Sequence, residues 1–256
     1  MKTPPSPRLT LRGVVKRHEG RIVLAGLDLD VLPGQILGVV GPGGQGKSVL
    51  LKHLPRLIAP DSGEVRLDGV DLATMTGFEL ARAREHFGYL FQNYALFDFM
   101  TVGENVAFPL RQERRHTDSD IMDKVRARLT EVGLLRALHQ YPRELSGGMK
   151  KRVGLARATI SDPSVAIYDD PTAGLDPVTS SRIFALIAKM HAHVPGCASI
   201  IVSHDLDRMA PIVERWVYLD SGRIHFTGTS AELRAATRTD PRLGRFFAGS
   251  LLEGAS

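Results

Sequence analysis

A glycine-rich segment at residues 41–48 has the residue types and spacing of a phosphate-binding loop. It reads Gly41-Pro42-Gly43-Gly44-Gln45-Gly46-Lys47-Ser48, which matches G-x-x-x-x-G-K-S. Glycines let backbone N–H groups curl around phosphate oxygens, and the N-terminus of a following helix adds a favourable dipole. In this pattern Lys47 would reach the β- and γ-phosphates, and the Ser48 hydroxyl would bind Mg²⁺. A buried strand before and a helix after distinguish this segment from an ordinary glycine turn, so it predicts a nucleotide site.

A carboxylate ends a buried strand further along the chain. The run Val165-Ala166-Ile167-Tyr168-Asp169 is apolar until its last residue. A carboxylate at the C-terminal edge of a parallel sheet can hold Mg²⁺, directly or through water. Many buried strands end in aspartate, so the run is informative only because a phosphate loop precedes it. We therefore expect Asp169 to join Ser48 among the ligands of Mg²⁺.

A second glycine-containing turn lies between these two segments. Leu145-Ser146-Gly147-Gly148-Met149 would place a helix N-terminus beside an anion. Alone it would indicate only a loop. Because Lys150, Lys151 and Arg152 follow it and Ala173-Gly174-Leu175-Asp176 comes later, it resembles the signature motif of ABC proteins. The resemblance covers essentially the whole chain and implies a protein that binds and hydrolyses ATP.

Three further residues resemble ABC motif positions. Gln92, in Phe91-Gln92-Asn93, resembles the Q-loop glutamine, which contacts Mg²⁺ and the attacking water and senses the membrane partner. His204, in Val202-Ser203-His204-Asp205, resembles the switch histidine at the γ-phosphate. A lone histidine at a strand end would otherwise be a plain polar residue. Asp176 resembles the D-loop aspartate, which communicates across a dimer.

The same resemblance implies a second copy of the chain. ABC domains trap ATP between the phosphate loop of one subunit and the signature motif of another. We therefore expect Ser146, Gly147 and Gly148 to contact ATP that a partner holds, in a head-to-tail dimer with two shared sites. Splitting the site between subunits would make hydrolysis depend on closure.

The position after Asp169 departs from the ABC pattern. A glutamate usually stands there and polarises the attacking water, whereas this chain has Asp170. Its arm is one methylene shorter, and a displacement of about 1 Å can cost as much as ~100-fold in rate. We expect Asp170 to take the catalytic role with slow hydrolysis. The alternative is a regulatory module that binds nucleotide without turnover.

The position that stacks on adenine is the second departure. ABC domains usually place Tyr or Phe there, and Val15-Lys16-Arg17-His18-Glu19-Gly20 offers His18. An imidazole can stack on adenine, although with less area than a phenol. A plain surface histidine is the alternative interpretation.

Strands and helices that alternate along the chain must position these residues. Leu27, Leu29 and Val31 show the period of two that is typical of a half-buried strand, and residues 36–40 form an apolar run typical of a strand buried on both faces. A helix should begin near Val49 and be shortened by Pro55. Asp61-Ser62-Gly63 predicts a turn, and Asp220-Ser221-Gly222 predicts the turn of a hairpin.

The middle of the chain, residues 93–162, is predicted to be a helical insert. Ile121, Val125 and Leu129 recur at helical spacing after the capping residue Thr117. The expected fold class is α/β, a P-loop NTPase core of the ABC type with a mixed or parallel sheet and an N-terminal antiparallel β subdomain. The chain is expected to form one such domain over residues 1–256, with residues 240–256 as a C-terminal tail.

Composition limits where the protein works and what it binds. No stretch of the sequence approaches the ~18 apolar residues that a membrane-spanning helix needs, and residues 1–5 lack the apolar run of a signal peptide. A single cysteine, Cys197, is typical of a reducing compartment.

The net charge of +5 comes from 33 basic and 28 acidic residues that are interspersed, and no nucleic-acid motif accompanies it. We expect a cytoplasmic protein that binds no nucleic acid.

Several segments resemble the Mla/Mce subfamily of ABC ATPases. They are residues 96–110, residues 50–54, Met149 to Arg152 after the signature motif, and Asp240-Pro241-Arg242 leading to Phe246-Phe247. Members of this group energise movement of phospholipids or other hydrophobic molecules between bacterial membranes. The resemblance implies a permease of the MlaE type, a lipid-binding Mce protein and a position on the cytoplasmic face of the inner membrane.

The segment after Gln92 is where ABC proteins usually grip their permease. It is unusually apolar for a surface loop, with Tyr94, Leu96, Phe97, Phe99 and Met100. Some of these side chains would otherwise fill the core of the insert. Arg111, Arg114 and Arg115 would face lipid heads or, more simply, solvent. Phe246-Phe247 would dock on the partner ATPase subunit.

Two other functions are compatible with the ATPase motifs. The first is the ATPase of an importer for amino acids or another small solute, which the loop after Gln92 and the tail disfavour. The second is a soluble ABC protein that acts on nucleic acid or ribosomes. Such proteins usually carry two ATPase units or a long coiled-coil insertion, and this sequence has neither.

Overall fold

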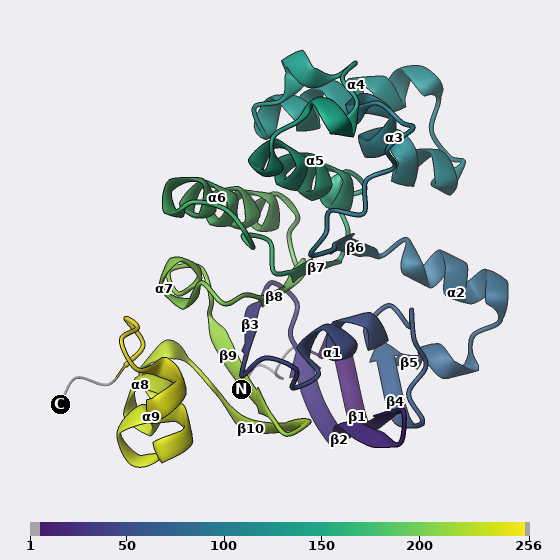
Figure 1. Cartoon of the computed structure of the whole chain (residues 1–256). Coiled ribbons are helices and arrows are strands. Elements are labelled where there is room, and N and C mark those ends of the chain that lie inside the picture. Colours follow the sequence, from purple (N-terminus) through teal and green to yellow (C-terminus); the bar gives the residue numbers. More distant parts are fainter. Residues whose placement is uncertain (1–5, 254–256) are drawn as a thin grey trace, which may run out of the picture.

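Two β-sheets carry the fold of residues 6–253, the part of the chain that the computed structural model describes. The smaller sheet is antiparallel and has the strand order β2-β1-β4-β5. Its strands are β1 (Leu9–His18), β2 (Arg21–Val31), β4 (Ser62–Leu67) and β5 (Val70–Asp71), at the lower right of Figure 1. The predicted N-terminal antiparallel subdomain is therefore confirmed, although Ser62 and Gly63 belong to β4 and not to a turn.

The larger sheet is mixed and has the order β10-β9-β3-β8-β7-β6. Its strands are β3 (Ile36–Val40), β6 (Phe87–Leu90), β7 (Val165–Asp169), β8 (Ala198–Val202), β9 (Arg215–Asp220) and β10 (Arg223–Gly228). Neighbouring strands are parallel except for the hairpin β9–β10. The C-terminal ends of β3, β6, β7 and β8 therefore meet at one edge, where ligands bind in sheets of this kind.

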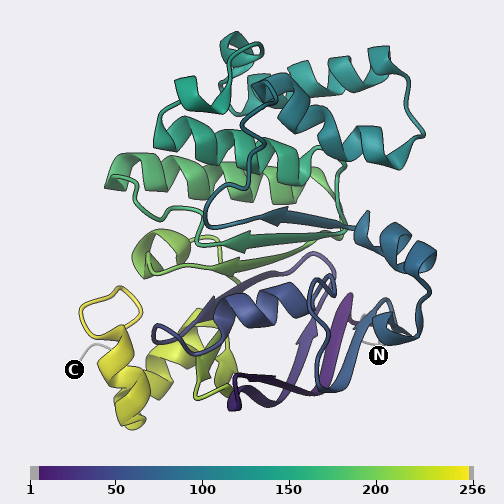
Figure 2. The same cartoon turned by 45° about the vertical axis from the view of Figure 1, so that its right-hand side comes forward.

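Both faces of the central strands are covered, which explains their uninterrupted apolar sequences. All residues of β3, β7 and β8 are buried. Side chains alternate between the faces of a strand. Ile167 accordingly packs in a core shared with α1 (Lys47–His53), whereas Tyr168 packs in the core under α6 (Pro177–His193). Figure 2 shows α6 (light green) between the helical insert and the strands β6 and β7.

The helical insert has a core of its own at the top of Figure 1. It contains α3 (Val102–Glu113), α4 (Asp118–Glu131) and α5 (Gly147–Thr159). Thr117 caps α4 as predicted, in a capping box with Asp120. The prediction that helical structure begins near Asn93 is wrong. Tyr94 and Ala95 have φ values of 61° and 49°, which a right-handed helix cannot contain, and α3 begins only at Val102.

The remaining helices connect the strands. They are α2 (Gly77–Arg84), α7 (Leu206–Met209), α8 (Ser230–Thr239) and α9 (Pro241–Phe247). Helix α1 ends at His53, as the nearby Pro55 predicted. Within residues 6–253, no helix has the length and apolar character needed to cross a membrane. Residues 1–5, on which the absence of a signal peptide was judged, lie outside the described part.

The tail folds back onto its own domain. Phe247 is fully buried, with its ring centroid 6.5 Å from that of Trp216 and 6.3 Å from that of Tyr218. Phe246 is partly buried, and its ring lies edge-on to Tyr218 at 5.1 Å. The expectation that both phenylalanines dock on a partner subunit is therefore wrong for Phe247. The sequence showed an apolar pair but not the pocket in the same chain that accepts it.

Candidate functional site

The glycine loop leaves β3 and enters α1 with a backbone that requires glycine at two positions. Gly41 has a φ of 147°, and a Cβ there would meet the carbonyl oxygen of Leu219. Gly46 has a φ of 91°, and its Cβ would lie 2.9 Å from the carbonyl oxygen of Val23. A Cβ on Gly43 or Gly44 would meet nothing within 4 Å. The loop is therefore closely packed at its ends and open at its crest, where a phosphate would sit.

The side chain of Lys47 lies under this crest. Only 7% of the residue is exposed, and its ammonium donates hydrogen bonds to the carbonyl oxygens of Gly41 and Pro42, both at 2.7 Å. Burial lowers the pKa of Lys47, while the nearby charges of Asp170 and Asp169 oppose that shift. The loop thus holds a buried cation that can turn toward an anion above it.

The first turn of α1 meets the end of β7. The Ser48 hydroxyl donates a hydrogen bond to Oδ1 of Asp169 at 3.0 Å. Asp169 is 5% exposed, and burial raises its pKa, although the Ser48 hydrogen bond lowers it. Two oxygen-bearing side chains from distant segments therefore face each other, as a hard cation such as Mg²⁺ requires.

Asp170 follows on a backbone of left-handed conformation. Its φ is 48°, and its N–H donates to the carbonyl oxygen of Val202 at 2.8 Å. Aspartate tolerates this conformation better than most residues, because its short polar side chain can bond locally. The turn directs the chain away from the sheet and leaves Asp170 half-buried at its edge.

One cavity of about 380 Å³ brings most of the predicted residues together. Its lining combines the glycine loop with the ends of three strands. The residues are Val23, Gly43, Gly44, Gly46, Lys47, Ser48, Val49, Gln92, Asp169, Asp170, Val202 and His204. The structure therefore places Gln92, Asp170 and His204 around the same space as the phosphate loop. Gln45 instead uses its side-chain oxygen to accept a hydrogen bond from the N–H of Ser221, at 2.7 Å.

His18 is not among the residues of this cavity. It is exposed at the end of β1, and the same hairpin contributes Val23 to the lining. Its assignment to adenine stacking stays a prediction.

The signature segment lines a different cleft. Ser146, Gly147, Gly148 and Asp176 surround a cavity of about 740 Å³ together with residues of α6. Ser146 caps α5 by accepting a hydrogen bond from the N–H of Met149 at 3.3 Å. Asp176 caps α6, and the hydroxyl and N–H of Thr179 lower the pKa of its carboxyl. Within one chain, the signature segment does not reach the phosphate loop.

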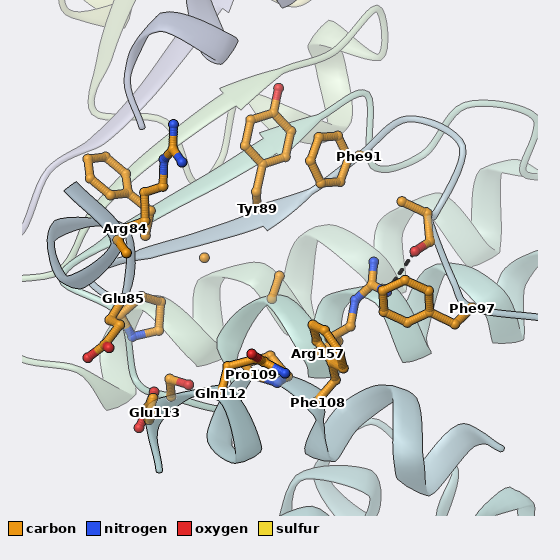
Figure 3. Close-up of a pocket in the computed structure, with 17 residues that line it drawn as sticks. Arg84, Glu85, Tyr89, Phe91, Phe97, Phe108, Pro109, Gln112, Glu113 and Arg157 are labelled. Carbon is orange, nitrogen blue, oxygen red and sulfur yellow. Dashed lines mark hydrogen bonds between the residues drawn. The ribbon is translucent and has the colours of Figure 1, made fainter. Parts of the chain in front are cut away.

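A third cavity, of about 490 Å³, lies between β6, α2, α3 and α5. Its walls are aromatic: Figure 3 shows Tyr89 and Phe91 side by side on one wall, and their rings stack at 4.0 Å. Phe97 and Phe108 lie on another wall, with centroids 4.8 Å apart. We call this cavity the aromatic groove.

Arg157 is a charged residue in the lining of the aromatic groove. Its guanidinium donates to the carbonyl oxygens of Ala95 at 2.7 Å and Tyr94 at 2.8 Å, and lies 5.7 Å from the centroid of Phe97 (Figure 3). Burial lowers the pKa of Arg157. Of the apolar residues predicted for a permease interface, Phe97 lines the groove and Phe99 is 75% exposed. Leu96 packs instead on the core of the insert.

Sequence reasoning missed Lys151. Its ammonium is buried and donates to the carbonyl oxygens of Gln92 and Asp170, two residues that line the 380 Å³ cavity. The two lysines after the signature motif indicated only a subfamily. A lysine one position from another gives no sign of which one is buried.

The fold and the convergence of loop, carboxylates and histidine define a P-loop nucleotide-binding protein of the ATP-binding cassette class. A family profile described as "ABC transporter" matches residues 24–173. The chain belongs to the ABC transporter family and is an ATPase subunit of such a transporter. Cassettes of this family bind ATP, form dimers and work with membrane permeases.

Curated relatives come from several transport systems. The methionine import ATP-binding protein MetN of Carboxydothermus hydrogenoformans is 39% identical over 77% of this chain and 58% of its own length. The intermembrane phospholipid transport system ATP-binding protein MlaF of Haemophilus influenzae is 33% identical over 94% of this chain and 90% of its own. The chloroplastic protein TRIGALACTOSYLDIACYLGLYCEROL 3 of Arabidopsis thaliana is 37% identical over 94% of this chain and 73% of its own. The chain therefore spans little more than half of MetN but most of MlaF.

Solved structures of ABC cassettes have the same fold. The dimeric, post-hydrolysis structure of the cassette MJ0796 with ADP and Pi is 29% identical and has a TM-score of 0.79, covering 86% of this chain and 98% of its own. The structure of cbiO1 from Clostridium perfringens is 26% identical with a TM-score of 0.79, covering 94% of this chain and 99% of its own.

Proposed function

We propose that the 380 Å³ cavity binds the triphosphate of Mg²⁺-ATP and that the chain hydrolyses it. The observation that carries this proposal is the meeting of Ser48 with Asp169 beside Lys47. Backbone N–H groups of the glycine loop and the Lys47 ammonium would bind the phosphates. His204 would bind the γ-phosphate.

Mg²⁺ fits the residues present. Ser48, Asp169 and Gln92 would supply oxygen ligands, which this ion prefers. No three histidine, cysteine or carboxylate side chains converge as a metal site within residues 6–253. We propose that the phosphates of ATP and water would complete the coordination. When bound, the ion would neutralise charge that develops on the transferred phosphoryl group.

Asp170 is the proposed base for the attacking water. Its carboxylate lines the cavity beside His204, and its short arm sets it back from the position that a glutamate would reach. We propose slow hydrolysis for this reason.

A head-to-tail dimer would complete each site. The signature cleft lies apart from the phosphate loop in one chain, so a second copy is the natural source of Ser146, Gly147 and Gly148 for the bound ATP. The related MJ0796 cassette has a dimeric structure with bound ADP and Pi, which supports pairing of two copies. Asp176, at the start of α6, would lie near the contact between the copies.

The proposed cargo is a phospholipid or another hydrophobic molecule. MlaF matches 94% of this chain, and the Arabidopsis relative, whose name refers to trigalactosyldiacylglycerol, matches 94% as well. The aromatic groove supports docking of an MlaE-type permease, because its rings would bury the apolar side chains of a cytoplasmic helix. An Mce-type lipid-binding protein would be the further partner. The chain would then lie on the cytoplasmic face of the inner membrane.

Co-purification from membranes tests the transport assignment. The tagged chain should bring down a permease with bound phospholipid, and Phe99→Ser together with Phe97→Ala should abolish that association while leaving hydrolysis by the isolated chain unchanged. Leu251→Ser is the matched control, because Leu251 is 68% exposed but lies in the C-terminal tail. Equal permease recovery with the double variant would contradict docking in the groove.

A small-solute importer is the second candidate, because MetN shares 39% identity with the chain. Stimulation of the purified complex by an amino acid with its binding protein, and not by phospholipid vesicles, would favour that assignment.

A further inference from the structure

A buried lysine joins the helix after the signature segment to both catalytic segments of the nucleotide cavity. Lys151 lies on α5 and is 1% exposed. Its ammonium donates a hydrogen bond to the carbonyl oxygen of Gln92 at 2.7 Å and another to the carbonyl oxygen of Asp170 at 3.0 Å. The first acceptor follows β6 and the second follows β7. One side chain from the insert therefore fixes two separate turns of the core.

Several contacts compensate for burying this charge. The ammonium lies 4.8 Å from the ring centroid of Tyr94, within the range of a cation–π interaction. Burial lowers the pKa of Lys151, and the charges of Asp170 and Asp169 raise it. A buried ammonium without partners is strongly unfavourable. The two carbonyls must therefore stay close to the lysine for the charge to be accommodated.

The lysine is also linked rigidly to the signature segment. Lys151 lies five positions after Ser146, the cap of α5, which is about 7.5 Å along a helix axis. No loop intervenes, so a movement of the helix start moves the ammonium. The Tyr94 hydroxyl lies near the start of the same helix, since a Cβ built on Gly147 would be 3.6 Å from its oxygen.

We propose that Lys151 is a positioning residue for hydrolysis, which holds Gln92 and Asp170 in register with the helix that carries the signature segment. In this role it acts through the two backbone carbonyls. Contact of Ser146, Gly147 and Gly148 with a nucleotide on a second copy would then set Gln92 and Asp170 in the same chain's own cavity. The inference rests on the proposed function, since it needs both hydrolysis and the head-to-tail dimer.

ATP affinity and kcat together distinguish a positioning role of Lys151 from a role in folding alone. The phosphate loop and Lys47 make no hydrogen bond to Lys151, so nucleotide binding should survive its loss. Misplacing Gln92 and Asp170 by about 1 Å should reduce turnover by roughly 10- to 100-fold. A lysine that serves only the fold would change binding and turnover together.

The test uses Lys151→Met and Lys151→Gln in the full chain. Methionine has a similar length and no donor, whereas glutamine keeps two N–H donors without the charge. The matched control is Lys150→Met, which removes the adjacent lysine of the same helix. For each protein, ATP affinity is measured in EDTA by titration with a fluorescent ATP analogue, so that a displaced Gln92 does not act on it through Mg²⁺. The value of kcat is measured by phosphate release, and folding by thermal unfolding.

We expect Lys151→Met to lower kcat at least ~10-fold with ATP affinity within about twofold of wild type. The kcat of Lys151→Gln should lie between those of Lys151→Met and wild type. Lys150→Met should match wild type in kcat and in ATP affinity. Wild-type-like kcat in both Lys151 variants, or an equal loss in Lys150→Met, would overturn the inference alone. So would parallel losses of ATP affinity and kcat. If Lys151→Met does not fold, Lys151→Gln decides. No Mg²⁺-dependent hydrolysis by wild type would overturn the proposed function and this inference with it.

Discussion

The Ser48 hydroxyl donates a hydrogen bond to the Asp169 carboxylate at 3.0 Å, although 121 residues separate the two in sequence. Ser48 follows β3 and Asp169 ends β7, and these two strands are not neighbours, because β8 lies between them. The contact forms because α1 turns back over the sheet immediately after the glycine loop. A buried carboxylate and a hydroxyl thus meet at the edge where the strands end, which is the arrangement that a phosphate-bound Mg²⁺ requires.

Ser48→Ala should weaken binding of Mg²⁺-ATP without affecting metal-free ATP. The variant loses one oxygen ligand of the metal, and at about 1.5–3 kcal/mol for a contact with a charged group the expected loss is roughly 10- to 100-fold in affinity. Nucleotide titrations with Mg²⁺ and with EDTA measure the two affinities. Ser181→Ala, on the exposed side of α6, is the control. Equal weakening in EDTA would show that Ser48 acts on the phosphates and not on the metal.

Asp170→Asn should abolish hydrolysis and spare nucleotide binding. Asparagine fits the left-handed backbone at φ 48° as well as aspartate does, so the fold is kept while the base is removed. We expect kcat to fall at least ~100-fold. Asp170→Glu should raise kcat because its longer arm reaches further, with a lower Tm because glutamate suits this backbone less well. Rates of both variants within twofold of wild type would exclude Asp170 as the base.

His18→Ala should weaken ATP binding if the imidazole stacks on adenine. Aromatic stacking contributes about 0.5–1.5 kcal/mol, so the expected loss is roughly 2- to 10-fold. His18→Tyr should tighten binding, because a phenol has more area. Competition between ATP and GTP gives a second measurement, and wild type should accept GTP almost as well as ATP. An unchanged affinity in His18→Ala would place this exposed residue outside the site.

Local patterns were sufficient to predict most of the fold. The apolar runs of β3, β7 and β8 are uninterrupted because helices cover both faces of the sheet. The sequence of each strand therefore indicated that it is buried. The helix cap at Thr117 is a purely local signal and was also predicted. The start of the insert was misplaced, because the backbone at Tyr94 and Ala95 is fixed by hydrogen bonds from Arg157, a residue more than 60 positions away.

Contacts between distant segments also limited how much of the candidate site could be predicted from the sequence. Most residues of the cavity were predicted because motif spacing identifies them, whereas the apolar residues Val23, Val49 and Val202 were not. Lys151 was missed because its role depends on two backbone carbonyl groups. Every residue has such a group, so residue types do not indicate which carbonyls a lysine contacts. The tail misled for the same reason. Phe247 would suit an interface equally well, and only the pocket beside Trp216 and Tyr218 shows that it belongs to the core.

Phe247→Ala should destabilise the chain without changing how its copies associate. Removing a fully buried phenylalanine typically costs ~3–5 kcal/mol, because a cavity remains where the ring was. Urea unfolding measures this loss, and sedimentation of the folded variant with ATP measures dimer formation. Phe246→Ala, at a partly buried position, should cost less. If the Phe247→Ala variant kept its stability but no longer formed dimers, the tail would instead contribute to the interface between copies.

Glu104→Gln should lower the stability of the helical insert at neutral pH but not in acid. The Glu104 carboxylate accepts hydrogen bonds from the N–H of Thr101 at 2.7 Å and from its hydroxyl at 3.0 Å, and these contacts lower its pKa. A depressed folded-state pKa contributes stability above the unfolded value of about 4.3, and this stability is lost as the pH falls through the folded-state pKa. Glutamine keeps the acceptor of the capping box but not its charge at the helix N-terminus. We expect a Tm about 1–3 °C below wild type at pH 7, converging with wild type near pH 3. A deficit of the same size at both pH values would mean that the carboxylate charge does not stabilise α3.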